Sequence, residues 1–245
     1  MSNAIKLNLW LPDSYRKEYV IVYKRLLKTY EKISQKVFSS IEKSTEEYGN
    51  MLVKEYNTMY NCEFINPEDI FENINYEKAD FYEMEKLMEY NFKLSSLSTA
   101  YQLFEQQLRK FMYEEIDHAY NPIEREAFVK FGTNMRKIKE LYKYVGYELS
   151  SDKYWSDIEE LINIVNTFKH GKGHSSEKLY AKNPDFFLNA GFSNKKLIDQ
   201  ELTSNAAIVL DIERIDVEHY INILIHFWED FPKHVYAIYE IAEKA

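Results

Sequence analysis

Apolar residues return every three or four positions along most of the chain, which is the pattern of amphipathic helices. Pro12 and Asp13 are typical of a helix start, and the pattern then runs over 15–61 with Gly49 as the one place where the helix could break. The apolar positions are Tyr19, Val22, Tyr23, Leu26, Leu27, Tyr30, Ile33, Val37, Phe38 and Ile41. The spacing predicts a long N-terminal helix whose apolar stripe needs a partner.

The same period predicts further helices over 77–118, 123–149 and 153–170, the last one capped by Ser150-Ser151-Asp152. A final helix is predicted after Asp216, bent or broken at Pro232 and resumed to 242. The segments 62–76 and 171–202 are rich in Asn, Asp, Gly and Pro, so they are predicted to be a connector and a long loop. The only short β element is expected near 206–212, where Ile208, Val209 and Ile212 fall.

The composition favours an all-α fold. The chain has 245 residues, 45% of them hydrophobic, with only 6 Gly and 5 Pro, which suits long uninterrupted helices better than turn-rich sheets. We therefore predict a multi-helix bundle with a long N-terminal helix. The connector at 62–76 suggests two regions, a long helix or helical hairpin over 1–76 and a helical bundle over 77–245.

The net charge, the cysteine content and the hydropathy of the chain limit the partners and the kinds of site that we expect. A formal net charge of −9 disfavours a general electrostatic grip on nucleic acid, so any RNA contact is expected to be local. The single cysteine, Cys62, excludes an intrachain disulfide framework and a thiolate zinc site. No window approaches the roughly 18 apolar residues of a membrane span, and no secretory signal is recognisable, so we expect a cytoplasmic protein without membrane contact.

Candidate chemistry gathers at the end of the helix over 153–170. At about 100° per residue, one broad face is apolar, while Glu159, Asn163, Asn166 and His170 share the opposite stripe. An imidazole with an ordinary pKa near 6.5 can transfer protons, and the two amides can orient a substrate. The neighbouring cations could hold a phosphate and the glycines allow close backbone approach; these residues are Lys169, Lys172, Gly171 and Gly173.

The same residues also have a simpler interpretation as an ordinary helix cap. Lys, His and Gly are common at helix C-termini, because cations complement the helix dipole and Gly adopts the left-handed cap. His170 and His174 are four residues apart, but Gly171-Lys172-Gly173 breaks the helix that would align them on a metal, so neither metal nor cofactor is expected. The 21 Tyr and 15 Phe recur at helical spacing, which favours a bundle core over base-stacking platforms.

Three segments together resemble the HEPN superfamily. They are a helix with Leu97-Ser98-Thr99-Ala100-Tyr101-Gln102-Leu103-Phe104-Glu105, a helix ending Asn166-Thr167-Phe168-Lys169-His170-Gly171, and a final helix bearing Phe227-Trp228. The resemblance covers about 77–242. The family signature is an Arg, often followed by Asn, with a His four to six residues after the Arg. Asn166 and His170 match, whereas the Arg position holds Val165.

The resemblance implies a dimeric helical bundle from bacterial toxins or anti-phage abortive-infection effectors, many of which are metal-independent ribonucleases. It implies an RNA substrate, His170 acting on the ribose hydroxyl, Asn166 orienting, and a partner protein from the same defence system. Asn163, Lys169, Lys172, Gly171, Gly173 and His174 are the expected substrate contacts. Because Val165 replaces the Arg, a catalytically inactive module that oligomerises or senses a partner is the alternative.

Overall fold

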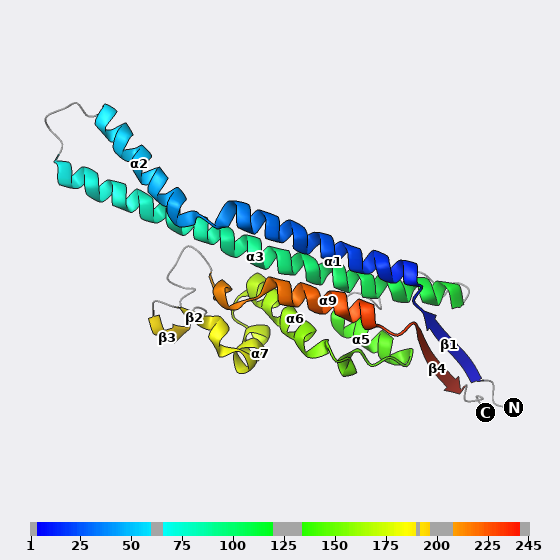
Figure 1. Cartoon of the computed structure of the whole chain (residues 1–245). Coiled ribbons are helices and arrows are strands. Elements are labelled where there is room, and N and C mark those ends of the chain that lie inside the picture. Colours follow the sequence, from blue (N-terminus) through cyan, green and yellow to red (C-terminus); the bar gives the residue numbers. More distant parts are fainter. Residues whose placement is uncertain (1–3, 60–65, 120–133, 190–191, 197–207, 241–245) are drawn as a thin grey trace.

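The computed structural model describes residues 4–59, 66–119, 134–189, 192–196 and 208–240. In these residues, helices pack into a bundle from which a two-helix arm projects (Figure 1). The predicted all-α bundle with a long N-terminal helix is confirmed. Among the described helices, none combines the length and the apolar character needed to cross a membrane.

The long N-terminal helix begins as predicted but breaks elsewhere. Helix α1 spans Asp13–Ile33, a π-helical turn follows at Ser34–Phe38, and α2 spans Ile41–Met59. The Ser39 hydroxyl donates to the Gln35 carbonyl, a side-chain bond that competes with the helix ladder and bends helices. The predicted break at Gly49 is wrong. Gly49 lies inside α2, where a Cβ would come within 2.4 Å of Lys78 Cδ on α3, so it allows close helix packing.

Helix α3 spans Pro67–Ala119 and starts earlier than the predicted position 77. The prediction of a connector over 62–76 is wrong from Pro67 onward, because Asn66 and Pro67 serve as a helix start. Asn66 Oδ1 accepts the Glu68 N–H at 3.2 Å, and Pro is favoured at the first helical position. Helix α3 therefore runs without interruption past the suggested boundary at 76. Cys62 lies outside the described residues.

The remaining bundle helices are α5 Met135–Tyr144, α6 Trp155–His170, α7 His174–Lys182 and α9 Val217–Asp230. Helix α5 ends before the predicted 149 because Gly146 adopts φ 86°; positions 123–133 lie outside the described residues. Helix α6 starts at Trp155 rather than 153, without a side-chain cap. The predicted loop over 171–202 in fact contains α7 and the β2–β3 hairpin, Leu188–Asn189 with Phe192–Lys196. Asp216 caps α9 as predicted.

A two-stranded ribbon extends from the end of the bundle beyond α9 (Figure 1). Strand β1, Ala4–Trp10, pairs antiparallel with β4, His234–Glu240, in the register Ala4–Glu240 to Trp10–His234. The predicted helix after Pro232 is therefore wrong, because this segment finds backbone partners on β1. The predicted strand near 206–212 is also wrong over its described part, where 208–211 is irregular and Ile212–Arg214 is a 3-10 turn.

Aromatic side chains form the centre of the core, as predicted. Trp228 of α9 is fully buried and contacts Tyr19 of α1, with ring centroids 4.6 Å apart. Phe104 of α3 packs edge-on against Phe227 at 5.0 Å, and Phe111 packs against Phe231 at 5.6 Å. These contacts join α1, α3 and α9 into one core.

Candidate functional site

Helix α6 presents the two faces expected from its sequence. Its inner face is buried in the bundle, namely Trp155, Ile158, Leu161, Ile164 and Val165, with Ile162 and Phe168 partly buried. On the opposite stripe, Asn163 and Asn166 are half-buried, while Glu159 and His170 are exposed. The polar stripe therefore lies at the surface, where a ligand can reach it.

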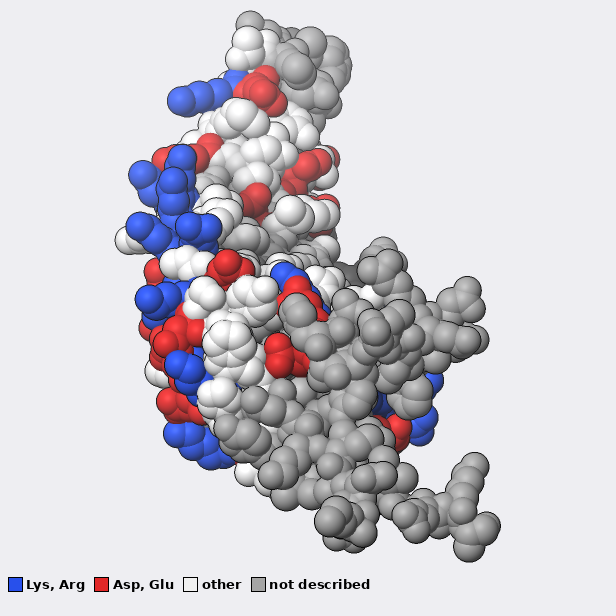
Figure 2. Space-filling view, turned by 90° about the vertical axis from the view of Figure 1, so that its right-hand side faces the viewer, with Lys and Arg blue, Asp and Glu red and all other residues white. Residues whose placement is uncertain are grey.

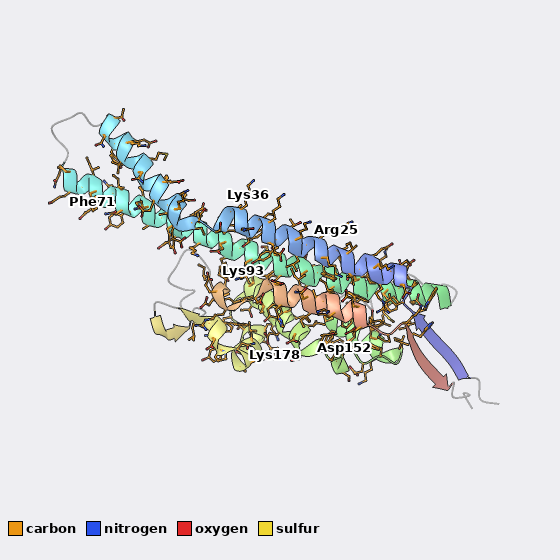
Figure 3. The ribbon with its side chains drawn as sticks, in the orientation of Figure 1. Arg25, Lys36, Phe71, Lys93, Asp152 and Lys178 are labelled. Atoms are coloured by element: carbon orange, nitrogen blue, oxygen red, sulfur yellow. The ribbon has the colours of Figure 1, made fainter. Side chains whose placement is uncertain are left out.

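A groove of about 420 Å³ lies between α5, α6 and α7. Asn163 and Asn166 line it from α6, His174 and Lys178 from α7, and Lys139 from α5. Its other lining residues are Met135, Arg136, Glu140, Lys143, Glu148, Trp155, Glu159, Ile162 and Ser175. This volume falls in the range of small-molecule and substrate sites. Figure 3 places Lys178 on the side of the bundle opposite α1.

Cations and carboxylates of the groove partly neutralise each other. Lys143 Nζ lies 3.2 Å from Glu148 Oε2, and this contact lowers the pKa of the Glu148 carboxyl. Arg136 Nε lies 3.8 Å from Glu140 Oε1, a contact between exposed groups that solvent screens. Lys139 Nζ is 5.1 Å from the centre of the Trp155 ring, a cation–π distance.

Lys178 is exposed and forms no ion pair within the part of the chain that the structure describes. Lys139 and Lys178 therefore remain available to balance the charge of an anionic ligand.

The turn after α6 uses its own backbone donors. Gly171 has φ 65° and ψ −137°, and its N–H donates to the Thr167 carbonyl at 2.8 Å. The Gly173 N–H donates to Ser176 Oγ at 2.8 Å, and the Ser176 hydroxyl donates back to the Gly173 carbonyl at 2.7 Å. Neither glycine N–H points freely at a substrate. Helix α6 ends at Gly171, as the capping interpretation predicts, but with ψ −137° the residue does not adopt the expected left-handed helical conformation.

The structure brings together some of the residues predicted from the sequence. Asn163, Asn166 and His174 share the groove, whereas the other predicted site residues lie outside its lining; these are Lys169, His170, Gly171, Lys172 and Gly173. Sequence analysis missed Arg136, Lys139 and Lys178. Two of them come from α5, the helix before α6, and Lys178 lies in a segment predicted to be a loop, so no pattern within α6 linked them to its polar stripe.

Val165, where the resemblance expects an arginine, is fully buried in the core and is not among the residues that line the groove. A guanidinium in this structure reaches the groove from Arg136 instead. No protein-family model, curated protein or solved structure matches the chain. The function therefore has to follow from the chemistry of these residues.

Proposed function

We propose that the chain is a HEPN-like, metal-independent endoribonuclease of the toxin or anti-phage kind, and that the groove between α5, α6 and α7 binds the RNA backbone. One observation carries the proposal: Asn163, Asn166 and His174 share a groove with cations of α5 and α7. An imidazole, amide donors and cations are the groups that a phosphodiester cleavage needs when no metal takes part.

In the proposed reaction, one imidazole accepts the proton of a ribose 2′-hydroxyl. The 2′-oxygen then attacks the adjacent phosphorus, the bond from phosphorus to the 5′-oxygen breaks, and a second acid protonates the leaving oxygen. His174 in the groove and His170 at the end of α6 are the two candidates for these proton transfers. The products are a 2′,3′-cyclic phosphate and a 5′-hydroxyl.

The cationic groups have separate roles in this scheme. Lys139 and Lys178 balance the charge of the phosphate, and Arg136 supplies the planar guanidinium that the resemblance expects at Val165. Asn166 donates an amide hydrogen bond to a phosphate oxygen. The site therefore combines groups from three helices, and the proposal needs no cation at Val165.

The test is cleavage of tRNA and single-stranded RNA by the purified chain in the presence of EDTA. We expect the wild type to leave 2′,3′-cyclic phosphate ends, and His174→Ala or His170→Ala to lower the rate by roughly 10²- to 10⁴-fold, the usual loss of a general acid or base. His226→Ala is the matched control, because His226 lies on α9, outside the groove, beside Glu229. The proposal would be refuted if the wild type left the RNA uncut. It would also be refuted if His174→Ala and His170→Ala both cleaved RNA as fast as the wild type.

The alternative, favoured by the buried Val165, is a catalytically inert module that binds a partner. Growth of cells that express the wild type or His170→Ala separates the two. We expect the wild type to slow growth and the variant to relieve this effect at equal protein level. If His170→Ala and His174→Ala each slow growth as much as the wild type does, the inert module is favoured.

A further inference from the structure

Glu159 is the one carboxylate of the groove that lacks a cationic partner among the described residues. Of the three glutamates that line the groove, Glu140 lies 3.8 Å from Arg136 and Glu148 lies 3.2 Å from Lys143. The carboxylate of Glu159 is exposed and forms no ion pair within the described part of the chain, although lysines line the same groove. Because a carboxylate repels a phosphate, we expect Glu159 to face another part of the ligand.

Positive charge alone does not single out the groove as the place where RNA binds. Arg25 and Lys36 project from the side of α1 that faces away from the bundle, whereas Lys178 lies on the opposite side (Figure 3). Figure 2 shows Lys and Arg side chains gathered along one edge of the molecule, with carboxylates between them lower down. Since cations anywhere on a surface attract the RNA backbone, binding in the groove needs groups that recognise more than phosphate.

The neighbours of Glu159 in the groove are an amide and apolar side chains. Asn163 lies one helical turn further along α6, on the same stripe, and lines the groove. Ile162 and Met135 line it as well, and both are only partly buried against the core. A nucleobase packs its flat face on apolar atoms and is recognised through hydrogen bonds along its edge. The groove offers both kinds of contact.

The chemistry of a carboxylate distinguishes between the four bases. An ionised carboxylate has two acceptor oxygens and no donor. The Watson–Crick edge of guanine has two adjacent donors, N1–H and N2–H, beside one acceptor, O6. Adenine and cytosine place an acceptor nitrogen next to their amino group, and uracil has a single N–H between two carbonyl oxygens. Guanine is therefore the base that gives a donor to each oxygen of Glu159 and leaves O6 for the amide N–H of Asn163.

The spacing along α6 fits one nucleotide. Asn166 lies seven residues beyond Glu159, which is about 10 Å along the helix at 1.5 Å per residue. This length is close to the distance between the edge of a guanine base and the 3′-phosphate of the same nucleotide. Asn166 and His174 both line the groove. A base bound at Glu159 can therefore place its phosphate beside these two residues.

We propose that the groove selects guanine and that the chain cuts RNA on the 3′ side of guanosine. Glu159 accepts hydrogen bonds from N1–H and N2–H of the base, and Asn163 donates one to O6. The 2′-oxygen of this guanosine attacks its own 3′-phosphorus, and the bond to the 5′-oxygen of the next nucleotide breaks. The fragment then ends in guanosine 2′,3′-cyclic phosphate. This inference rests on the proposed RNA cleavage and adds the base that is recognised.

The first test is calorimetric binding of 3′-GMP, 3′-AMP, 3′-CMP and 3′-UMP to the full-length chain, which requires no cleavage. We expect 3′-GMP to bind roughly 10- to 100-fold more tightly than the others, the usual discrimination by a bidentate contact. Glu159→Gln should remove this preference, because an amide offers one acceptor and places a donor against the donors of guanine. Glu177→Gln is the matched control and should keep the preference, because Glu177 is exposed on α7 and does not line the groove.

The second test is cleavage of single-stranded RNA that contains one guanosine in a run of uridines. We expect a cut on the 3′ side of the guanosine, and Glu159→Gln should slow this cut by roughly 10- to 100-fold. In an RNA with adenosine in place of guanosine, Glu159→Gln should cut at the same rate as the wild type. Circular dichroism verifies the fold of each variant.

The two tests separate this inference from the proposed cleavage. Equal affinity for the four nucleotides, or cleavage of RNA without preference for guanosine, would overturn the inference. If Glu159→Gln slowed cleavage equally at every base, Glu159 would act on the ribose and the inference would again be overturned. A preference for 3′-GMP that depends on Glu159, found in a chain that cuts no RNA, would support the guanine site and refute the proposed cleavage alone.

Discussion

Gly171 and Gly173 flank Lys172 in one short turn, yet their backbones differ. Gly171 has φ 65° and ψ −137°, a region that residues with a Cβ rarely adopt, whereas Gly173 has φ 172°, an extended conformation open to any residue. A Cβ added to Gly173 would meet nothing within 4 Å. Only the first glycine is therefore required for the turn between α6 and α7.

We expect Gly171→Ala to lower the free energy of unfolding by about 1–3 kcal/mol, the usual cost of forcing a side chain into such a region. Gly173→Ala is the matched control and should change it by less than about 0.5 kcal/mol. Urea denaturation followed by circular dichroism measures both. Equal losses for the two variants would contradict the assigned conformations.

At the level of the elements, one carboxylate joins three helices. Glu160 of α6 accepts hydrogen bonds from Tyr220 of α9 and, at 2.7 Å, from Lys182 of α7. Burial raises the pKa of Glu160, but the hydrogen bonds from Lys182 and Tyr220 outweigh it, so the pKa lies below its ordinary value. The network attaches α7, which has few buried apolar residues of its own, to the bundle.

Glu160→Gln should cost about 1–3 kcal/mol of stability at neutral pH, because hydrogen bonds to a charged acceptor are lost. Since the pKa is lowered in the folded chain, the stabilisation by Glu160 is present above the ordinary glutamate pKa and is lost as the pH falls below it. The difference between wild type and variant should therefore vanish in acid. Glu159→Gln, at an exposed neighbouring position, should leave the stability unchanged. If the wild type and Glu160→Gln still differed as much in stability in acid, the stabilisation would not come from the charged Glu160 carboxylate.

At the level of the whole molecule, the arm and the bundle differ in how much they bury. The arm, α2 with the first part of α3, buries only a few apolar side chains, such as Ile41, Leu52 and Ile74. The bundle buries Trp228 and the aromatic residues around it. Local opening follows buried apolar contact, so the arm should open at lower free energy than the bundle.

Native-state hydrogen exchange should show faster exchange over 41–59 and 67–85 than over 158–165 and 221–228. The bundle amides are expected to exchange only through global unfolding. Equal protection of the two regions would contradict the prediction that the arm opens at lower free energy than the bundle.

The helical period determined much of the fold from the sequence alone: the all-α class, the start at Asp13, the buried face of α6 and the Asp216 cap of α9 are local properties of the residues. Local patterns also placed Asn163 and Asn166 at the surface. They could not give the helical start at Asn66, where turn formers act as a cap, or the strand β4, whose backbone partner lies at the other end of the chain.

The groove was decided by tertiary packing. Arg136 and Lys139 reach it from α5, and Lys178 and His174 from α7, because these consecutive helices pack around α6. Val165, in contrast, lies in the core as the helical period predicts, because it falls on the apolar face of α6. Residue spacing fixes which side chains share a helix face, since that depends only on the backbone repeat. The neighbours that each face meets depend on how the whole chain buries its apolar surface.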